Sequence, residues 1–494
     1  MKAIPVFFSA AMLLLGALPL RADGPAVTIV TDPKATEIER YAAAELTRLL
    51  ESLFEARVAL SPGAVPTDGT KVIHLGTTLL PEVGKALDIS LEEQGHLVRS
   101  TPHGLVIHGG SPTATLWAVY EYGYANGMRY LVAGDFLPVE KPEFTLEGYD
   151  IVLKTASQPI RQWRVAGDTA AGLASWGFDD NLKLLRQLAK LKFNRVSLPE
   201  AGAWPEVEPI DVTGDIGGRA AFGGAREFRN PEEAVTGLSA RIAEAAAALG
   251  LQSAGKDAAD LPTIALGQAD GGLLPQKAAV GPLAPGAGFS VQAHVVGDHN
   301  PELHYLSRAA FDPRLTADQA LVDLATPICG EGVAEALSLG FGAVAEASAL
   351  IQKHDPGFAV PDPAMFMEHY RSADPAPAWW AEAKGLYAKG MNEMYRANTR
   401  ARDGARPWIL YHAKRYTFAL HYLTAVESAR AAGIARAAKD EAAWEEQLAL
   451  AIEAMHNALG IYSEVAADQS DRGVIALLNE HGYRPLLEAL DELP

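Results

Sequence analysis

The feature that most constrains the fold is a strand–helix–strand unit in residues 160–200. Its helix, "DDNLKLLRQLAKLKF", repeats its leucines at helical spacing, and we expect Asp179 or Asp180 to cap it. The strand candidates "IRQWRVAG" and "NRVSLPE" flank the helix directly, which is typical of parallel strands joined by a helical crossover. Two further strand candidates, "PTIALGQADGG" (262–272) and "FSVQAHVVG" (289–297), continue the pattern. The sequence therefore predicts a parallel sheet.

The segments on either side of this sheet differ in character. Residues 26–150 alternate strand candidates such as "AVTIVT" and "KVIHLGT" with two helices, and Pro102-His103-Gly104 predicts a hairpin turn. In the first helix, "EIERYAAAELTRLLESLF" (37–54), the apolar residues fall largely on one face, and Thr36 can cap it. From Pro301 onward the pattern is almost wholly helical, with breaks at prolines and glycines. We place the boundaries of the three parts at 23–155, 156–300 and 301–494.

Charge and cysteine content exclude some classes of partner and of stabilisation. The 494 residues carry a formal net charge of −19, which disfavours nucleic acid and anionic membranes as partners because like charges repel. The single cysteine, Cys329, allows no internal disulfide framework. We interpret it as a small buried apolar residue rather than a nucleophile.

The N-terminus has the pattern of a targeting segment. Lys2 precedes an apolar stretch that ends near Leu18, and Ala22 is a plausible cleavage position. Because the apolar stretch is short for a membrane span, we interpret residues 1–22 as a signal peptide, with an uncleaved anchor as the alternative. The expected location is the periplasm or the extracellular space, with no membrane span after cleavage.

Several stretches together carry a family likeness. They are "ERYAAAELTRLLE" (39–51), "KVIHLGT" (71–77), "GLVIHGGSPTATLWAVYEYGYANGMRYL" (104–131) and "LLRQLAKLKFNRVSLP" (184–199). In these segments the chain resembles exported glycoside hydrolases of the α-glucuronidase and β-N-acetylhexosaminidase type. The resemblance implies a small α/β domain, a (β/α)8 barrel and a closing helical domain, with an oligosaccharide or polysaccharide as substrate.

The barrel region is shorter than the resemblance implies. A complete (β/α)8 barrel takes about 250 residues, whereas only residues 160–300 are available here. The adjacent Asp-Glu pair of the hexosaminidases does not occur between 160 and 300. We therefore expect an α/β fold class: a small mixed α/β N-terminal domain, a truncated or incomplete (β/α) barrel and an all-α C-terminal domain.

Two acids stand where a barrel enzyme keeps its catalytic groups. Glycoside hydrolysis commonly uses two carboxyl groups, and in a barrel these lie at the carboxyl ends of strands. Glu200 follows "NRVSLP" and Asp270 follows "IALGQA", so we predict them as the catalytic pair. The alternatives are a turn residue for Asp270, because Asp-Gly is a common turn signal, and a solvated loop acid for Glu200.

Neighbouring residues of the first predicted strand could bind substrate. Arg164 resembles the arginine that holds sugar hydroxyls in hexosaminidases, and its planar fork would also suit a uronate. The alternative is an ion pair with Asp168. Trp163 or Trp176 could stack on a sugar ring, although a tryptophan at either position is more often simply part of the core.

The loop after the last predicted strand is rich in polar side chains. In "AHVVGDHNPELH" (293–304), His294 and Asp298 are candidate substrate contacts, and an ordinary polar loop is the alternative. The spacing of its histidines and carboxylates matches no known zinc motif. We therefore predict no metal and no cofactor.

One helix of the C-terminal part could cover the site. In "WILYHAKRYTFALHYL" (408–423), Tyr411 and Arg415 are four residues apart and share a face, as do His412 and Tyr416. Packing between helices is the alternative for this face.

Two hypotheses about function follow. The first is a glycoside hydrolase-like protein that acts on acidic or amino-sugar polysaccharides by carboxylate acid/base catalysis. The second is a non-catalytic glycan-binding protein that has lost part of the barrel. A misjoined reading frame without a stable fold would be a third explanation of the short barrel. The sequence does not indicate the oligomeric state.

Overall fold

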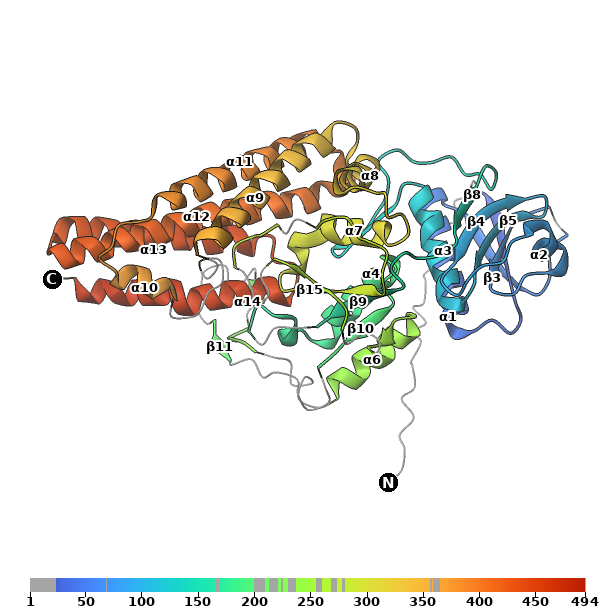
Figure 1. Cartoon of the computed structure of the whole chain (residues 1–494), viewed down its shortest axis with the longest axis horizontal. Coiled ribbons are helices and arrows are strands. Elements are labelled where there is room, and N and C mark those ends of the chain that lie inside the picture. The colour runs from blue at the N-terminus through green and yellow to red at the C-terminus, as the bar shows by residue number, and fades with distance from the viewer. Residues whose placement is uncertain are drawn as a thin grey trace, which may run out of the picture.

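The computed structural model describes most of the chain after residue 23. The described residues are 24–67, 69–165, 169–199, 209–212, 221–223, 225–229, 237–254, 260–267, 273–277, 280–355, 358 and 365–493. In Figure 1 a strand-rich region lies at one end of an elongated molecule, a second sheet lies in the centre, and long helices form the other end. This is the predicted order of a mixed α/β part, a strand-containing centre and a helical part.

The N-terminal part is a six-stranded mixed sheet in the order β2-β1-β3-β5-β4-β8. Strand β4 runs in the direction opposite to the other five strands, and its pairing with β5 closes the predicted hairpin at Thr101↔Gly104. Two helices, α1 and α3, pack against the sheet, and α1 begins at the predicted cap Thr36 in a capping box with Glu39. The elements are β1 (Ala26–Thr31), α1 (Glu37–Phe54), β2 (Arg57–Pro62), β3 (Lys71–Gly76), α2 (Pro81–Leu87), β4 (His96–Thr101), β5 (Gly104–Gly109), α3 (Pro112–Ala125), β6 (Arg129–Leu131), β7 (Gly134–Phe136) and β8 (Asp150–Leu153).

The central sheet has five described strands, all parallel, in the order β13-β10-β9-β15-β14. Helix α4 joins β9 to β10, as predicted, but its N-cap is Gly177, and Asp179 and Asp180 lie inside its first turn. At that position the two carboxylates interact favourably with the positive end of the helix dipole, and neither of them caps a backbone amide. The elements are β9 (Ile160–Arg164), η1 (Leu173–Ser175), α4 (Phe178–Lys190), β10 (Arg195–Ser197), α6 (Leu238–Ala248), β13 (Gln252–Ser253), β14 (Thr263–Leu266) and β15 (Gly288–Ala293), with a separate pair formed by β11 (Ile210–Asp211) and β12 (Glu227–Phe228).

The strand order identifies the central sheet as part of a barrel. From β9 to β10 to β13 the chain moves along the sheet in one direction, and from β14 to β15 it moves in that same direction. Because parallel crossovers are right-handed, all connections then fall on one face, whereas a doubly wound sheet reverses direction at its middle. The last strand, β15, lies beside the first, β9, as in a closed barrel. Among the described residues, the circle is open between β13 and β14.

The C-terminal part is a layer of long helices whose apolar faces form the largest core cluster. Helix α11 packs against both α9 and α12, and α12 packs in turn against α13 (Figure 1). Cys329 is fully buried at the end of α8, and burial raises the pKa of its thiol to about 12. The helices are α7 (Asn300–Ala309), α8 (Ala317–Cys329), α9 (Val333–His354), α10 (Met365–Arg371), α11 (Ala378–Arg400), α12 (Arg406–Ala438), α13 (Glu441–Ser463), α14 (Gln469–Leu478) and α15 (Arg484–Glu488), with the short turns η4 (Val296–His299), η6 (Asp403–Ala405), η7 (Asn479–Tyr483) and η8 (Ala489–Glu492).

Among the described helices, α9 alone is long and apolar enough to cross a membrane by length and composition. A core helix passes the same test, and 44% of the most apolar window of α9 is buried in the molecule. Its buried side chains, among them Leu337, Val344 and Ile351, belong to the core cluster of the helical part. We interpret α9 as a packed helix of that core.

A buried ion network joins the N-terminal part to the barrel part. Glu121 on α3 accepts hydrogen bonds from Lys192, after α4, and from Arg308 on α7. Glu121 and Lys192 each have side chains only 3% exposed. Burial alone would raise the pKa of Glu121, but the two cations hold it well below its ordinary value. The network therefore fixes one charged arrangement across the contact between the two parts.

Candidate functional site

The carboxyl edge of the central sheet is the place where a barrel keeps its active site. Because β9, β10, β14 and β15 pair in parallel, they end at the same edge. Their last residues there are Arg164, Ser197, Leu266 and Ala293. The segments that follow these strands therefore start from a common edge.

The predicted catalytic acids, Glu200 and Asp270, lie outside the described residues. The strands that precede them, β10 and β14, have two strands between them in the sheet. Along a flat sheet that spacing is about 14 Å, whereas working carboxyl pairs lie roughly 5–9.5 Å apart. Two carboxyl groups that follow these strands could therefore form a working pair only if the sheet curves enough to bring them together. The assignment of Glu200 and Asp270 as the catalytic pair stays a prediction.

Arg164 lies exposed at this edge, at the end of β9 and opposite Ser197 of β10. Side chains alternate along a strand, so Arg164 shares a face of the sheet with Gln162. Gln162 donates a hydrogen bond to Ser290 of β15 across that face at 3.1 Å. Asp168, its alternative ion-pair partner, lies outside the described residues. The position leaves the guanidinium open to solvent at the strand ends.

Trp163 points to the opposite face of the same strand. Its side chain is fully buried among leucines of α4 and α7, with its ring 6.3 Å from that of Phe193. A fully buried ring offers no face to a sugar, so this position fits the core alternative. Trp176 is also buried, and its indole donates to Ser470 at 2.8 Å.

His294 and Asp298 follow β15 and are both buried. Together with His299 and residues after β14 they line a narrow recess that reaches the carboxyl edge of the sheet. Both side chains therefore lie near the carboxyl edge, and their role as substrate contacts stays a prediction.

Asp298 is held by an arginine from the helical part. Arg415 of α12 donates from Nε to Oδ1 at 3.1 Å and from Nη2 to Oδ2 at 2.7 Å, which is a bidentate pair. The Arg415 side chain is 0% exposed and that of Asp298 is 4% exposed. Burial alone would raise the pKa of Asp298, but Arg415 keeps it below its ordinary value. The pair therefore stays ionised and ties the barrel edge to α12.

A second buried pair lies beside the first. Lys277 donates to the backbone carbonyl of Asp298 and to Glu302, the latter at 3.1 Å, and its ammonium lies 4.4 Å from the centre of the Phe341 ring. Sequence reasoning missed Lys277. A lysine inside the apolar run "LLPQKAAV" was the signal that could have revealed it, because an isolated buried cation needs a partner.

A carboxylate of α14 completes this region of buried polar groups. Asp471 accepts hydrogen bonds from the hydroxyls of Tyr462 and Tyr411, at 2.7 Å and 3.0 Å. The centre of the Tyr462 ring lies 4.3 Å from the Arg415 guanidinium. Sequence reasoning missed Asp471 as well, since nothing local distinguishes it from a surface acid at the start of a helix.

His412 lies among aromatic rings next to these pairs. It is fully buried, and neither ring nitrogen has a hydrogen-bond partner among the described residues. The rings of Phe341, Trp408 and Tyr411 meet it edge-on at 5.0 to 5.8 Å. Burial, followed by the charge of Lys277, lowers its pKa well below the ordinary value. The folded protein therefore keeps His412 neutral.

The buried histidine gives a prediction about acid stability. In the unfolded chain His412 takes up a proton below about pH 6.5, while the folded protein does not, so it costs stability as the pH falls. His412→Phe removes that loss. Relative to wild type, the free energy of unfolding of His412→Phe should rise by about 2 kcal/mol between pH 6.5 and pH 5. Urea unfolding at several pH values measures this difference, and a difference that does not change with pH would contradict the burial argument.

In the described part of the chain, no group of three or more His, Cys, Asp or Glu side chains is arranged to hold a metal ion. The carboxylates of Asp298 and Glu302 beside the sheet edge are held in ion pairs with Arg415 and Lys277.

Comparison with solved structures identifies the fold. The chain is similar to a novel family GH115 4-O-methyl-α-glucuronidase with specificity for decorated arabinogalactans, with a TM-score of 0.55 and 13% sequence identity over 92% of this chain and 80% of that one. This chain has a glycoside-hydrolase-like fold.

Two other similar structures are more distant. One is a GH138 enzyme targeting pectin rhamnogalacturonan II, with a TM-score of 0.46 and 7% identity over 94% of this chain and 100% of that one. The other is CpGH84B, with a TM-score of 0.38 and 10% identity over 88% and 93% of the two chains. No protein-family model and no curated protein sequence matches this chain.

Proposed function

We propose that the protein is an exported glycoside hydrolase-like protein that acts on acidic or amino-sugar polysaccharides at the carboxyl edge of the central sheet. The observation that carries this proposal is the strand order, in which β15 returns to lie beside β9. That order, between a mixed α/β part and a helical part, supports a barrel-type site at this edge.

The proposed roles follow from the chemistry of glycoside hydrolysis. One of Glu200 and Asp270 would protonate the leaving oxygen while the other attacks the sugar or activates water. Arg164, exposed at the end of β9, would bind a uronate or sugar hydroxyls through its guanidinium. An acidic sugar suits this residue best, because a planar fork can make two parallel hydrogen bonds to a carboxylate.

The catalytic assignment is tested by removing each acid. If the proposal holds, Asp270→Asn and Glu200→Gln each lower the rate of sugar release by at least about 100-fold, the usual contribution of a positioned acid or base. Asp260→Asn is the matched control, because Asp260 is an exposed acid shortly before β14. Hydrolysis that survives both substitutions would rule out this pair.

A second candidate function, glycan binding without hydrolysis, is favoured by a different observation. At the sheet edge the described acids Asp298 and Glu302 are already paired with Arg415 and Lys277. Groups locked in buried ion pairs do not act as acids or bases, and the described strands form less than a full barrel. Saturable binding of an oligosaccharide that the protein never cleaves would favour this second function.

A further inference from the structure

A cavity of about 450 Å³ lies where three parts of the chain meet. Its walls come from the β6–β7 hairpin, the first turns of α4, the start of α12 and the connection from α13 to α14. Among the described residues that line it, none belongs to a strand of the central sheet. A volume of this size is sufficient for a small organic ligand.

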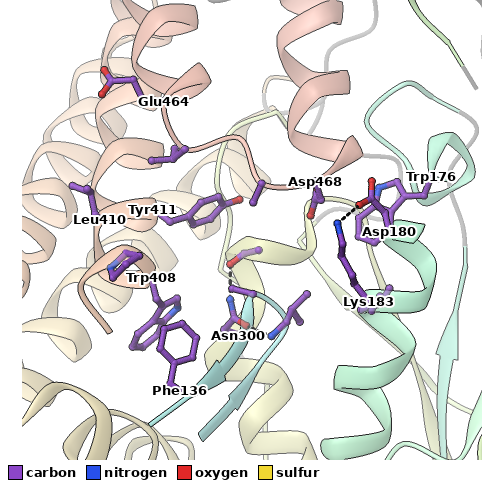
Figure 2. A pocket seen from close by; sticks show the side chains of 17 residues that line it. Phe136, Trp176, Asp180, Lys183, Asn300, Trp408, Leu410, Tyr411, Glu464 and Asp468 are labelled. Atoms are coloured by element: carbon purple, nitrogen blue, oxygen red, sulfur yellow. Dashed lines mark hydrogen bonds and ion pairs between the residues drawn. The ribbon is translucent and has the colours of Figure 1, made fainter. Parts of the chain in front are cut away.

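One side of the cavity is aromatic. Figure 2 shows Phe136, Trp408 and Tyr411 grouped together on that side. Tyr411 is held in place because its hydroxyl donates to Asp471 at 3.0 Å. A side chain at Gly297 would approach the Tyr411 hydroxyl to 2.7 Å, so the glycine lets the η4 turn lie directly against this ring. Trp408 and Tyr411 are 2% and 8% exposed, whereas Phe136 is half-buried, so this apolar wall offers chiefly the Phe136 ring to the C–H face of a sugar.

The opposite side of the cavity carries polar groups. Figure 2 shows Asp180, Lys183 and Asp468 there, with Lys183 pointing toward Asp180. Lys183 pairs with Asp180 at 3.2 Å. Asp468 caps α14, since its Oδ1 accepts from the Asp471 backbone amide at 3.0 Å. This use of Oδ1 leaves Oδ2 of Asp468 as the carboxyl oxygen that a ligand can address.

The charge of this wall restricts the ligand. Among the described residues that line the cavity, Lys183 is the one cation, and it is already paired with Asp180, while Glu464 is paired with Lys414. Burial, together with the charge of Asp471, raises the pKa of Asp468 well above its ordinary value. A ligand that brought a carboxylate would lose its hydration without finding a free counter-charge among these residues, whereas the hydroxyl groups of a neutral sugar could hydrogen-bond to Asp468.

We propose that this cavity binds a saccharide unit of one or two rings that carries no carboxylate, packed against the apolar wall of Phe136, Trp408 and Tyr411 and hydrogen-bonded to Asp468. This inference goes beyond the proposed function, because it requires no hydrolysis and none of the residues at the sheet edge. It gives the protein a second place to hold a glycan, formed jointly by the N-terminal, barrel and helical parts.

Two variants of the full-length protein test the proposal. Ala133→Trp places a bulky side chain in the cavity from an exposed wall position. Asp468→Ser keeps a good helix cap but removes the second carboxyl oxygen. Asp440→Ser is the matched control, because Asp440 caps α13 in the same way, outside the cavity.

Saturation-transfer NMR with maltose, N-acetylglucosamine and glucuronic acid supplies the readout. Wild type should bind maltose or N-acetylglucosamine at least about tenfold more tightly than glucuronic acid, and both cavity variants should weaken that binding by about tenfold. Asp440→Ser should leave it unchanged. Equal binding of all three sugars, no binding of either neutral sugar, or binding that neither cavity variant affects would overturn the proposal.

Thermal unfolding of each variant separates loss of the site from loss of the fold. Should Ala133→Trp fail to fold, Asp468→Ser still decides the outcome. Asp270→Asn separates this proposal from the proposed function. Sugar binding retained in that variant, with or without hydrolysis by wild type, supports the cavity site independently.

Discussion

Arg415→Met should lower the free energy of unfolding by about 3–5 kcal/mol, because it leaves Asp298 buried without its counter-charge. The two side chains are 0% and 4% exposed and share two hydrogen bonds, and the nearby cation Lys277 is already paired with Glu302, so neither solvent nor this lysine replaces the arginine at the carboxylate. Methionine keeps much of the aliphatic volume. Chemical denaturation followed by circular dichroism measures the change.

A control and a second substitution make the Arg415 prediction specific. Arg314→Met removes an arginine that pairs with Asp312 at 3.3 Å while 91% exposed, so it should cost less than about 1 kcal/mol. Adding Asp298→Asn to Arg415→Met should recover at least about 1 kcal/mol, since the unpaired charge is then gone. A single-variant loss below about 1 kcal/mol would contradict the buried-pair interpretation.

Glu121→Gln should destabilise the contact between the N-terminal part and the barrel part by about 3–5 kcal/mol. Lys192 and Arg308 both direct their charges at this one carboxylate, and the substitution leaves the two cations facing each other in a buried place. Burial already lowers the pKa of Lys192 to about 8 despite its partner. Without the carboxylate it should lose its proton near neutral pH, so the destabilisation should be smaller at pH 8.5 than at pH 6.

The matched control for Glu121 is Glu37→Gln in the same N-terminal part. Glu37 is 92% exposed, and its ion pair with Arg40 is long, at 3.9 Å. Its replacement should therefore change the free energy of unfolding by a few tenths of a kcal/mol at most. Thermal unfolding of both variants at pH 6 and pH 8.5 gives the comparison. If the two substitutions had equal effects, the network would not hold the two parts together.

The local elements could be predicted from the sequence because their signals are local. Helix α1 begins and ends where the apolar period and the Thr36 cap predict, and the hairpin between β4 and β5 turns at the predicted residues. The parallel sheet followed from one strand–helix–strand unit. The cap of α4 was predicted wrongly because three polar or small residues, Gly177, Asp179 and Asp180, compete for one position.

The long-range pairs could not be predicted in this way. Arg415 and Asp298 are separated by 117 residues, and only the packing of α12 over the end of β15 brings them together. In the sequence, a carboxylate that follows a strand looks the same whether it is free to bind substrate or is paired with an arginine far along the chain. Periodicity alone did not show whether Trp163 is buried in the core either. Alternation along β9 places Trp163 on one face of the sheet and Arg164 on the other, but it does not indicate which face is the core.

The central claim, glycan hydrolysis at the carboxyl edge of the central sheet, is tested most directly by product analysis. Purified full-length protein is incubated with uronic-acid and amino-sugar oligosaccharides, and released sugars are identified by NMR. The account predicts that at least one acidic or amino-sugar substrate is cleaved and that Asp270→Asn abolishes the release. A folded wild-type protein that releases no sugar from any of these oligosaccharides would contradict it.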